Sequence, residues 1–381
     1  MRFLLDDEQT AFARSLDALL TAADTPAAVR SWGAGDPTAG RALWSRIAEA
    51  GVFALAVPEA YEGLGPRPVE LAVAFVELGR HVVPGPLVET VAAAALLTEP
   101  GPAKRFLPGL AAGTTVATVA LPGGGPYVLD GDAADLELTV TTPAATATDG
   151  GAVAESTAGA AELRAAQAPP PPSAPPSVPP SAPPSTSPSP SPSPSGETLA
   201  PRVRRSLDPA RRLRLPRPGG ELLGVGPSIG VAAADAVRWA RLATAAQALG
   251  VGLALLDRTV AYVKQRSQFG VPIGSFQAVR HRLADAKIAL EFARPLIFGA
   301  ALSMDPADLA AAKVAAGEAA YGAARTALQL HGAIGYTAEY DLSLWLTKAR
   351  ALRSAWGSPG ECRALVLGAD DVPGGGARRR S

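Results

Sequence analysis

The sequence predicts a mainly α-helical protein in which a reduced, small β domain separates an N-terminal helical domain from a C-terminal four-helix bundle. Three observations predict this class: helical spacing of apolar residues near the N-terminus, short β-prone pieces from about Thr114, and four long Ala- and Leu-rich segments after Val231. A chain of 381 residues has room for two or three domains and a large core. We place the domains at 1–113, 114–230 and 231–368, followed by a tail at 369–381 that is expected to be flexible.

Four segments of the first domain carry the spacing of apolar residues that is typical of a helix. They are 7–30, 38–51, 68–81 and 86–97. Clusters of glycine and proline interrupt the pattern at 33–37, 63–66 and 84–86, because both residue types end regular structure. The first domain is therefore expected to be all helical.

The middle domain opens with two β-prone pieces, 115–121 and 136–140, which are separated by Gly and Asp residues. A tract of almost pure Pro and Ser then runs from Pro169 to Pro194. Proline has no backbone N–H donor and the tract has almost no large apolar side chain, so it cannot build a sheet or a core. We expect an extended or disordered insertion in a surface loop, with a docking segment for a proline-recognising module as the less favoured alternative.

Seven arginines follow this tract, and solvated strands and turns are their favoured location. Binding of the phosphates of a CoA thioester is the alternative. The seven are Arg202, Arg204, Arg205, Arg211, Arg212, Arg214 and Arg217.

The C-terminal segments 232–266, 275–303, 306–330 and 338–355 are long enough to pack as a four-helix bundle. A bend is expected at Pro295, because proline removes a helical hydrogen bond. Asp305 and Pro306 supply an N-cap and a proline at the first helical position of the third segment.

The composition excludes several classes of function. The 35 basic and 35 acidic residues cancel, so no nucleic-acid partner is indicated. A single cysteine, Cys362, excludes an internal disulfide and a multi-cysteine zinc site, and no metal site is predicted. The N-terminus becomes acidic at Asp6 before a signal-peptide core could form, and no uncharged apolar run of about 18 residues predicts a membrane span. These observations favour a cytoplasmic protein.

Three motifs resemble those of the acyl-CoA dehydrogenase family and occur in this chain in the same order as in the family. The run Arg266–Gln277 has the pattern R-x-x-F-G-x-x-x-x-x-F-Q, which resembles the flavin-contacting signature of the family. The run Val57–Gly65 is similar to V-P-E-x-Y-G-G-L-G, with Glu62 in place of one glycine. The run Gln329–Tyr336 resembles Q-x-x-G-G-x-G-Y, with Ala333 in place of the second glycine.

The resemblance implies that FAD is the cofactor and that the first of these motifs contacts it. Arg266 would pair with the pyrophosphate, because a guanidinium is a permanently charged, planar donor. Gln268 and Gln277 would hydrogen-bond polar parts of the cofactor, and Phe269 would offer an aromatic face. In the family this segment reaches the flavin of a neighbouring subunit, so a dimer or tetramer is implied. The alternative is an ordinary helix–turn–helix in which Phe269 and Phe276 fill the core and Arg266 is exposed.

Gln329 and Gly332 are the remaining predicted cofactor contacts, since glycine lets backbone amides approach a ligand closely. Their alternative is a simple helix C-cap. No G-x-G-x-x-G follows a strand, so a Rossmann-type nucleotide site is not supported. His281 has Asp285 one helical turn onward, a pair that is more often a surface contact than a catalytic one. His81 and His331 have no acidic residue one turn onward, so the histidines add no catalytic candidate.

The reaction that the resemblance implies is α,β-desaturation of an acyl-CoA thioester, which needs a carboxylate to remove the α-proton. Ungapped alignment places Trp356 where most family members have this glutamate, and Ala240 stands at the position used by a second group. Glu361 lies five residues past Trp356, and Glu339 matches a non-catalytic residue of the family. The catalytic base is therefore unassigned.

The middle domain also departs from the family, because no T-E-P-G-x-G-S-D segment occurs near Leu121–Pro126. Thr98–Gly101 spells the first four letters but precedes the predicted strand, and we interpret it as a coincidence.

Two hypotheses follow. The chain is an FAD-dependent acyl-CoA dehydrogenase, with electron-transfer flavoprotein as its electron acceptor and a base located elsewhere in the chain or in a partner. Alternatively, it is a catalytically silent scaffold that pairs with an active homologous dehydrogenase subunit, as in heteromeric bacterial members of the family. A non-redox reaction on the same fold is a weaker third option.

Overall fold

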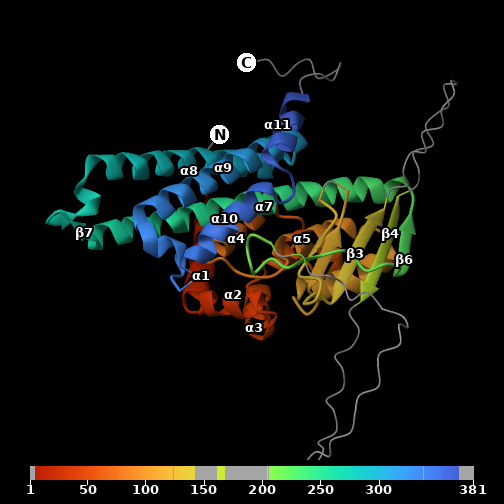
Figure 1. Ribbon diagram of the computed structural model, residues 1–381. Helices are drawn as coiled ribbons and strands as arrows, with labels where there is room; N and C mark the ends of the chain where they lie inside the picture. The colour runs from red at the N-terminus through yellow and green to blue at the C-terminus, as the bar shows by residue number, and fades with distance from the viewer. Residues whose placement is uncertain are drawn as a thin grey trace, which may run out of the picture.

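The computed structural model describes residues 5–122, 124–141, 161–167, 204, 206–337 and 339–368. Within these ranges a helical N-terminal region, a small sheet and a set of long C-terminal helices follow one another along the chain (Figure 1). The predicted fold class is confirmed. The Pro/Ser tract 169–194 and the tail 369–381 lie outside the described residues.

The N-terminal region contains six α-helices. They are α1 (Asp7–Thr21), α2 (Thr25–Gly33), α3 (Thr38–Glu49), α4 (Pro68–Arg80), α5 (Leu87–Leu96) and α6 (Pro100–Ala111), with two short 3₁₀ turns, η1 (Phe53–Ala56) and η2 (Glu59–Tyr61). Two predictions were wrong here. The single helix 7–30 is two helices, because the Asp24 carboxylate accepts the Ala27 backbone N–H at 3.1 Å and begins α2. The run Thr98–Gly101 leads into α6, a helix that the sequence did not predict.

The middle region is a four-stranded sheet of order β1-β3-β4-β6. Its strands are β1 (Ala117–Ala120), β3 (Leu136–Thr141), β4 (Glu162–Gln167) and β6 (Glu221–Val225). β1 and β3 are parallel, with Ala117 opposite Leu136, and the other neighbours are antiparallel. A separate pair joins β2 (Val128–Leu129) to β5 (Leu213–Arg214). Both predicted β-prone pieces contain a strand.

The C-terminal region has five helices rather than four. They are α7 (Pro227–Gln265), α8 (Gln277–Ser303), α9 (Pro306–His331), α10 (Leu342–Ser354) and α11 (Pro359–Gly368). The hairpin β7 (Ser267–Gln268) and β8 (Val271–Pro272) with η3 (Ile273–Ser275) joins α7 to α8, and η4 (Gly332–Tyr336) follows α9. α8 runs through Pro295 as one helix, so the bend stays a prediction. The Asp305 cap is confirmed, because its carboxylate accepts the Ala307 N–H at 2.8 Å.

α7 is the central helix of the fold and packs on α4, α5, α8, α9 and α10. Glycines allow its close contact with α4: a Cβ on Gly250 would lie 1.9 Å from the Val76 carbonyl oxygen, and a Cβ on Gly79 would lie 2.1 Å from the Gln247 carbonyl oxygen. α7 has the length and hydropathy of a membrane span, but 89% of its most apolar window is buried inside the protein. It is therefore a core helix.

Candidate functional site

The predicted cofactor residues Arg266, Gln268, Phe269 and Gln277 are all exposed, on the hairpin between α7 and α8 and at the start of α8. Figure 1 shows this hairpin, labelled β7, at the end of the molecule away from the sheet. Phe269 is 91% exposed, so the alternative in which it fills the core is wrong. Its ring packs edge-on against Phe276 at 6.3 Å between centroids.

The hairpin has a defined backbone. Phe269 and Gly270 both have positive φ, at 55° and 80°. The Ile273 N–H donates to the Arg266 carbonyl at 2.8 Å, and the buried Ile273 side chain anchors the turn. No carboxylate pairs with Arg266 in the part of the chain that the structure describes. Its guanidinium is thus presented for an anionic ligand.

The Gln329 segment lies at the same end of the bundle as this hairpin. His331 stacks on Tyr262, near the end of α7, with ring centroids 4.1 Å apart. The His331 Nδ1–H donates to the Ala327 carbonyl at 2.8 Å, and burial lowers the pKa of the imidazole. Gly332 has φ 64° and open space around it. The Gln329 side chain accepts a hydrogen bond from Arg282, so this amide would have to leave Arg282 to bind a cofactor.

These features fit the polar parts of FAD. The exposed guanidinium matches a pyrophosphate, the two free amides match hydrogen-bonding groups, and the open backbone at Gly332 permits a close approach. All of them lie on an exposed surface rather than in a pocket formed with the sheet.

A cavity of about 350 Å³ lies elsewhere, between α5, the β1–β2 region and the turn after α10. Trp356 and Glu89 line it, and the Trp356 indole N–H donates to Glu89 Oε1 at 3.2 Å. Gly124 also lines it, and a Cβ there would lie 2.9 Å from the indole ring. Its remaining lining residues are Val119, Tyr127, Leu129, Ser206, Leu207, Arg211, Leu213, Ala351, Ser354 and Ala355.

The turn that holds Trp356 is fixed from two sides. The buried Lys313 ammonium donates to the carbonyls of Leu352, Arg353 and Gly357 at 3.0 to 3.3 Å. Burial lowers the pKa of Lys313 to about 8. Arg241 donates to the Trp356 carbonyl at 3.3 Å. The structure therefore places 356 beside 240–241, the two positions where the resemblance puts the catalytic glutamate.

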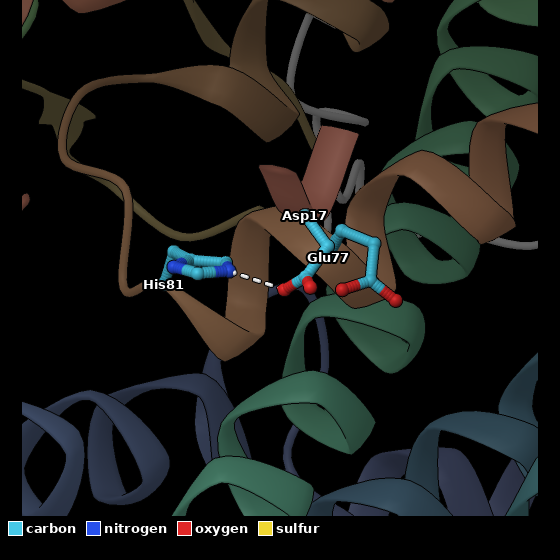
Figure 2. Close-up of side chains that lie close together, drawn as sticks. All are labelled: Asp17, Glu77 and His81. Atoms are coloured by element: carbon cyan, nitrogen blue, oxygen red, sulfur yellow. Dashed lines mark hydrogen bonds and ion pairs between the residues drawn. The ribbon is translucent and has the colours of Figure 1, made fainter. Parts of the chain in front are cut away.

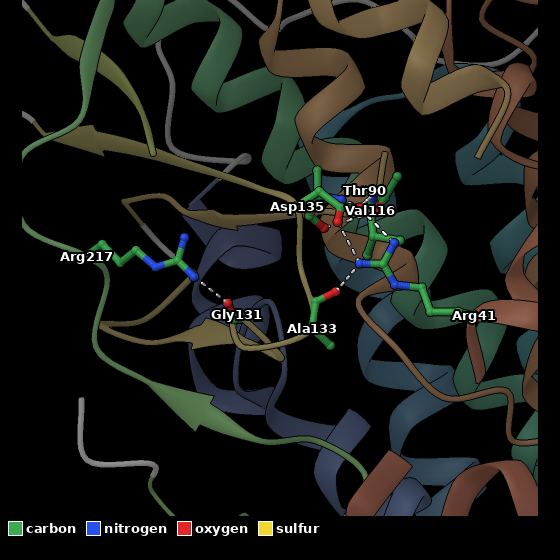
Figure 3. A network of polar contacts seen from close by, with 8 residues as sticks. Arg41, Thr90, Val116, Gly131, Ala133, Asp135 and Arg217 are labelled. Atoms are coloured by element: carbon green, nitrogen blue, oxygen red, sulfur yellow. Dashed lines mark hydrogen bonds and ion pairs between the residues drawn. The ribbon is translucent and has the colours of Figure 1, made fainter. Parts of the chain in front are cut away.

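α5 is held against the sheet on the other side of the cavity. The Thr90 hydroxyl donates to the Ala117 carbonyl at 2.9 Å, next to Glu89 in sequence. Figure 3 shows the neighbouring clamp, in which Arg41 donates to the Asp135 carboxylate through two nitrogens at 2.8 Å and to the Ala133 carbonyl at 2.6 Å. The Thr90 hydrogen bond holds the part of α5 that carries Glu89 against β1.

The prediction that the arginines after the Pro/Ser tract are solvated was wrong for three of them. Arg214 is buried in an ion pair with Glu137, Arg212 pairs with Asp132 at 2.9 Å, and the Arg211 side chain is only 11% exposed. The partners of Arg212 and Arg214 lie about 80 residues earlier, and Glu89, the partner of Arg211, lies earlier still, so sequence spacing could not reveal the pairs. Arg202 and Arg205 lie outside the described residues.

Neither carboxylate considered from the sequence lines the cavity. Glu339 is exposed. Glu361 caps α11: its Oε2 accepts the Ser358 backbone N–H at 2.8 Å, and its own N–H donates to the Ser358 hydroxyl at 3.3 Å. The hydrogen bonding of its carboxylate with Ser358 lowers the pKa of Glu361. Among the described lining residues Glu89 is the only acid, and the sequence signal for it is a lone charge in the otherwise apolar stretch of α5.

A separate polar cluster joins α1 to α4. Asp17, Glu77 and His81 place one ligand-type atom each within 4.8 Å of one another (Figure 2). His81 Nε2 lies 2.8 Å from Asp17 Oδ1, so His81 has an acidic partner that the sequence did not reveal. Glu77 pairs with Arg80 at 3.6 Å, and burial raises its pKa to about 7. We interpret the group as an interhelical ion-pair cluster.

Comparison with known proteins gives consistent matches along the chain. The model of the acyl-CoA dehydrogenase N-terminal domain matches residues 6–114, and that of the C-terminal domain matches residues 230–366. The chain is 32% identical over 339 residues to acyl-CoA dehydrogenase IpdE2 of Mycobacterium tuberculosis, covering 88% of this chain and 89% of the relative.

Solved structures resemble the fold over nearly its whole length. Butyryl-CoA dehydrogenase from Megasphaera elsdenii superposes with a TM-score of 0.73 at 20% identity, covering 98% of this chain and 100% of that chain. The ChsE4–ChsE5 complex from Mycobacterium tuberculosis gives 0.73 at 23% identity, covering 98% and 100%.

Proposed function

The chain belongs to the acyl-CoA dehydrogenase family of FAD-dependent oxidoreductases, and from this we propose that it works as one subunit of an oligomer in which flavin sites are shared between neighbouring subunits. Its activity is oxidation of the CH–CH bond of an acyl-CoA thioester, and FAD, when bound, accepts the hydride. Electron-transfer flavoprotein is the proposed electron acceptor, and the cytoplasm the proposed location.

The proposal that flavin sites are shared between subunits rests on a distance along α7. Arg241 contacts the turn of Trp356, and α7 continues from there to Gln265 before Arg266 begins the hairpin. The rise of the helix from Arg241 to Gln265 is about 36 Å, at 1.5 Å per residue. Arg266 is therefore too far from the Trp356 cavity of its own chain to contact a group bound there. We infer that Arg266, Gln268, Phe269 and Gln277, with Gln329 and Gly332, serve a flavin that lies against a neighbouring subunit.

An apolar surface on α8 supports the oligomer. Ile288, Phe292 and Leu296 recur every four residues, so they share one face of the helix. All three are exposed, Phe292 at 71%. Phe292 and Leu296 also line a groove of about 470 Å³ between α8 and α9. Burying such a face against another dehydrogenase subunit would remove apolar surface from water.

A catalytically silent scaffold is the second candidate function. The bulky, buried Trp356 at the family's glutamate position favours it, as does Ala240 at the alternative position, since neither side chain can accept a proton. In this case the neighbouring subunit would be a homologous dehydrogenase that supplies the base. The similarity of the chain to the ChsE4–ChsE5 complex is consistent with such a pair.

The test is purification of the tagged chain alone and together with a candidate homologous dehydrogenase subunit. Light scattering gives the mass of each preparation and a visible spectrum gives its flavin content. We expect flavin only in preparations that contain a dimer or larger assembly. A monomer that holds one FAD per chain contradicts the shared site.

A further inference from the structure

We propose that His331 is the positioning residue for the turn that contacts the cofactor, and that only its uncharged form holds this turn against α7, so that protons weaken the binding of flavin. The inference rests on the proposed function, because it takes Gln329 and Gly332 as contacts of a flavin that is shared with a neighbouring subunit. Three features carry it: the aromatic residues that pack on the imidazole, the packing of the turn on His331, and a buried ring nitrogen without a partner.

The imidazole of His331 is held by two tyrosines and by its own helix. The ring stacks on Tyr262 of α7, with centroids 4.1 Å and planes 23° apart, and Tyr340 before α10 lies 5.6 Å away at a tilt of 45°. The Nδ1–H donates to the Ala327 carbonyl at 2.8 Å, one turn earlier in α9. His331 is only 4% exposed. It therefore joins the end of α9 to α7 and to the segment before α10.

The η4 turn packs on this side chain. Gly335 is buried, and a Cβ on it would lie 3.2 Å from the Cβ of His331. Between these two buried positions residues 332–334 are exposed, as is Gln329 at the end of α9. A Cβ at Gly332 would meet nothing within 4 Å, so contacts at 332 itself do not fix its position. His331 and Gly335 are thus the anchors that set where the backbone at Gly332 faces solvent.

The second ring nitrogen makes this anchor sensitive to protons. Because Nδ1 donates to a carbonyl, the neutral ring carries its lone pair on Nε2. Nε2 is buried and has no hydrogen-bond partner within the described ranges. A proton there would place a charged N–H where no acceptor lies, which costs free energy. The charged ring would leave Tyr262 for water, and the turn that packs on it would move with it.

The charged side chains nearby do not compensate such a proton. The neighbouring elements contribute Tyr262 and Arg258 from α7, Tyr340 and Asp341 from the segment before α10, Tyr336 from η4, and Arg282 from α8. Asp341 interacts with Arg258, and Arg282 donates to Gln329. No carboxylate forms an ion pair with His331 in the part of the chain that the structure describes.

The direction of the pH effect follows from burial. Burial lowers the pKa of the His331 imidazole from its ordinary value of 6.5. A displaced turn accepts a proton at His331 that the anchored turn resists. The anchored turn is therefore fully favoured above pH 6.5, and this advantage is lost as the pH falls through the lowered pKa.

The test uses the flavin-loaded assembly, purified by a tag on this chain together with a candidate homologous dehydrogenase subunit. Serial dilution releases FAD, and the fluorescence of the free FAD gives its Kd at pH 8, 7, 6 and 5.5. Far-UV circular dichroism gives the melting temperature at each pH. For the wild type we expect a constant Kd above pH 7 and a rise below pH 6.5 of at most about tenfold per pH unit, the limit for one linked proton.

Two variants separate the charge of the ring from its shape. His331→Phe keeps an aromatic ring for Tyr262 but has no nitrogen to titrate, so it should bind FAD at pH 8 and lose the rise in Kd at low pH. His331→Ala removes the ring and should raise the Kd at every pH. His81→Gln and His281→Gln are the matched controls: they remove the other two histidines of the chain and should keep the wild-type profile.

The outcomes distinguish this inference from the proposed function. A wild-type Kd that is equal at pH 8 and pH 5.5, a wild-type rise in His331→Phe, or a wild-type Kd in His331→Ala overturns the role of His331 alone. If His331→Phe does not fold, the wild-type profile and His331→Ala decide. Loss of flavin from Arg266→Ala but not from His331→Ala likewise overturns only this inference. A wild-type assembly that binds no FAD overturns the proposed function, and the role of His331 with it.

Discussion

Arg266 is the residue on which cofactor binding should depend most. A guanidinium that faces a partly desolvated pyrophosphate contributes on the order of a few kcal/mol. Arg266→Ala should therefore release flavin from the assembly and leave folding intact, because the side chain is exposed and has no ion pair among the described residues. The visible spectrum after gel filtration measures the loss. Arg238→Ala, which removes a half-buried arginine of α7 that pairs with Asp235, is the control and should keep its flavin. Equal flavin content in both variants would count against the hairpin as a cofactor contact.

Asp130 should make the stability of the protein depend on pH. Burial raises its pKa from 3.8 to about 7, against the opposing effects of Arg212. Between these values the folded state holds a proton that the unfolded state releases, so this stabilisation is complete below about pH 4 and is lost as the pH rises through 7. Asp130→Asn keeps the acceptor for the Arg212 N–H and tolerates the positive φ of 48°.

The variant should therefore gain stability relative to the wild type at pH 8 and gain less at pH 5, with a difference of at most a few kcal/mol. Urea unfolding at both pH values measures it. Asp235→Asn, at a half-buried site on α7, is the control. The same change in unfolding free energy at pH 5 and pH 8 for Asp130→Asn would show that Asp130 does not titrate in this range.

At the residue scale, the sequence reveals short motifs but not the contacts between residues that are far apart in the chain. Arg266 and its neighbours are predicted to contact the cofactor because they are close together in the chain and match a known motif. The contact of Glu89 with Trp356 spans 267 residues, and that of Arg214 with Glu137 spans 77, so no local spacing contains them. A carboxylate introduced at 356 would consequently lie beside Glu89, which makes Trp356→Glu a poor test for the missing base.

At the scale of elements, the contact between α4 and α7 depends on glycine. Gly250→Ala should destabilise the protein by about 1–3 kcal/mol, because its Cβ would lie 1.9 Å from the Val76 carbonyl oxygen and would force the helices apart. Gly322→Ala is the matched control on α9: nothing lies within 4 Å of its Cβ, so higher helix propensity should stabilise the protein by about 0.5–1 kcal/mol. Thermal unfolding measures both. Equal melting temperatures for the two variants would mean that α4 and α7 can separate without cost.

The length of the apolar pattern in a segment explains which helices could be predicted from the sequence. Helices with clear apolar spacing, such as α7, α8 and α9, were found close to their observed bounds, since their pattern is long. α6 and α11 are short and begin at prolines that follow irregular segments, so no long pattern indicates them. The division of 7–30 into α1 and α2 depends on a side-chain cap at Asp24, which apolar spacing does not detect.

At the scale of the whole molecule, α7 connects the region of the sheet to the Arg266 hairpin. Its first half passes the sheet and the Trp356 turn, and its far end presents the Arg266 hairpin (Figure 1). One chain therefore has a cavity of about 350 Å³ at one place and the exposed Arg266 hairpin about 36 Å along the helix from it. In the proposed oligomer a neighbouring subunit would bring the hairpin to such a cavity, and composition and motifs alone do not define a site of that kind.

The Pro/Ser tract should contribute little to the stability of this molecule. Pro169 to Pro194 has almost no apolar side chain to bury, and shortening a loop changes its closure entropy by only about 0.6 kcal/mol per halving of length. Deleting these residues should leave the melting temperature within a few degrees of the wild-type value, because about 1 kcal/mol corresponds to only 2–4 °C in a protein of this size. Replacing the tract by a Gly/Ser segment of equal length separates composition from length and should give the same melting temperature. A loss of many degrees in both variants would show that the tract packs against the rest of the protein, and a loss of flavin or of the partner without a loss of stability would instead identify it as a docking segment.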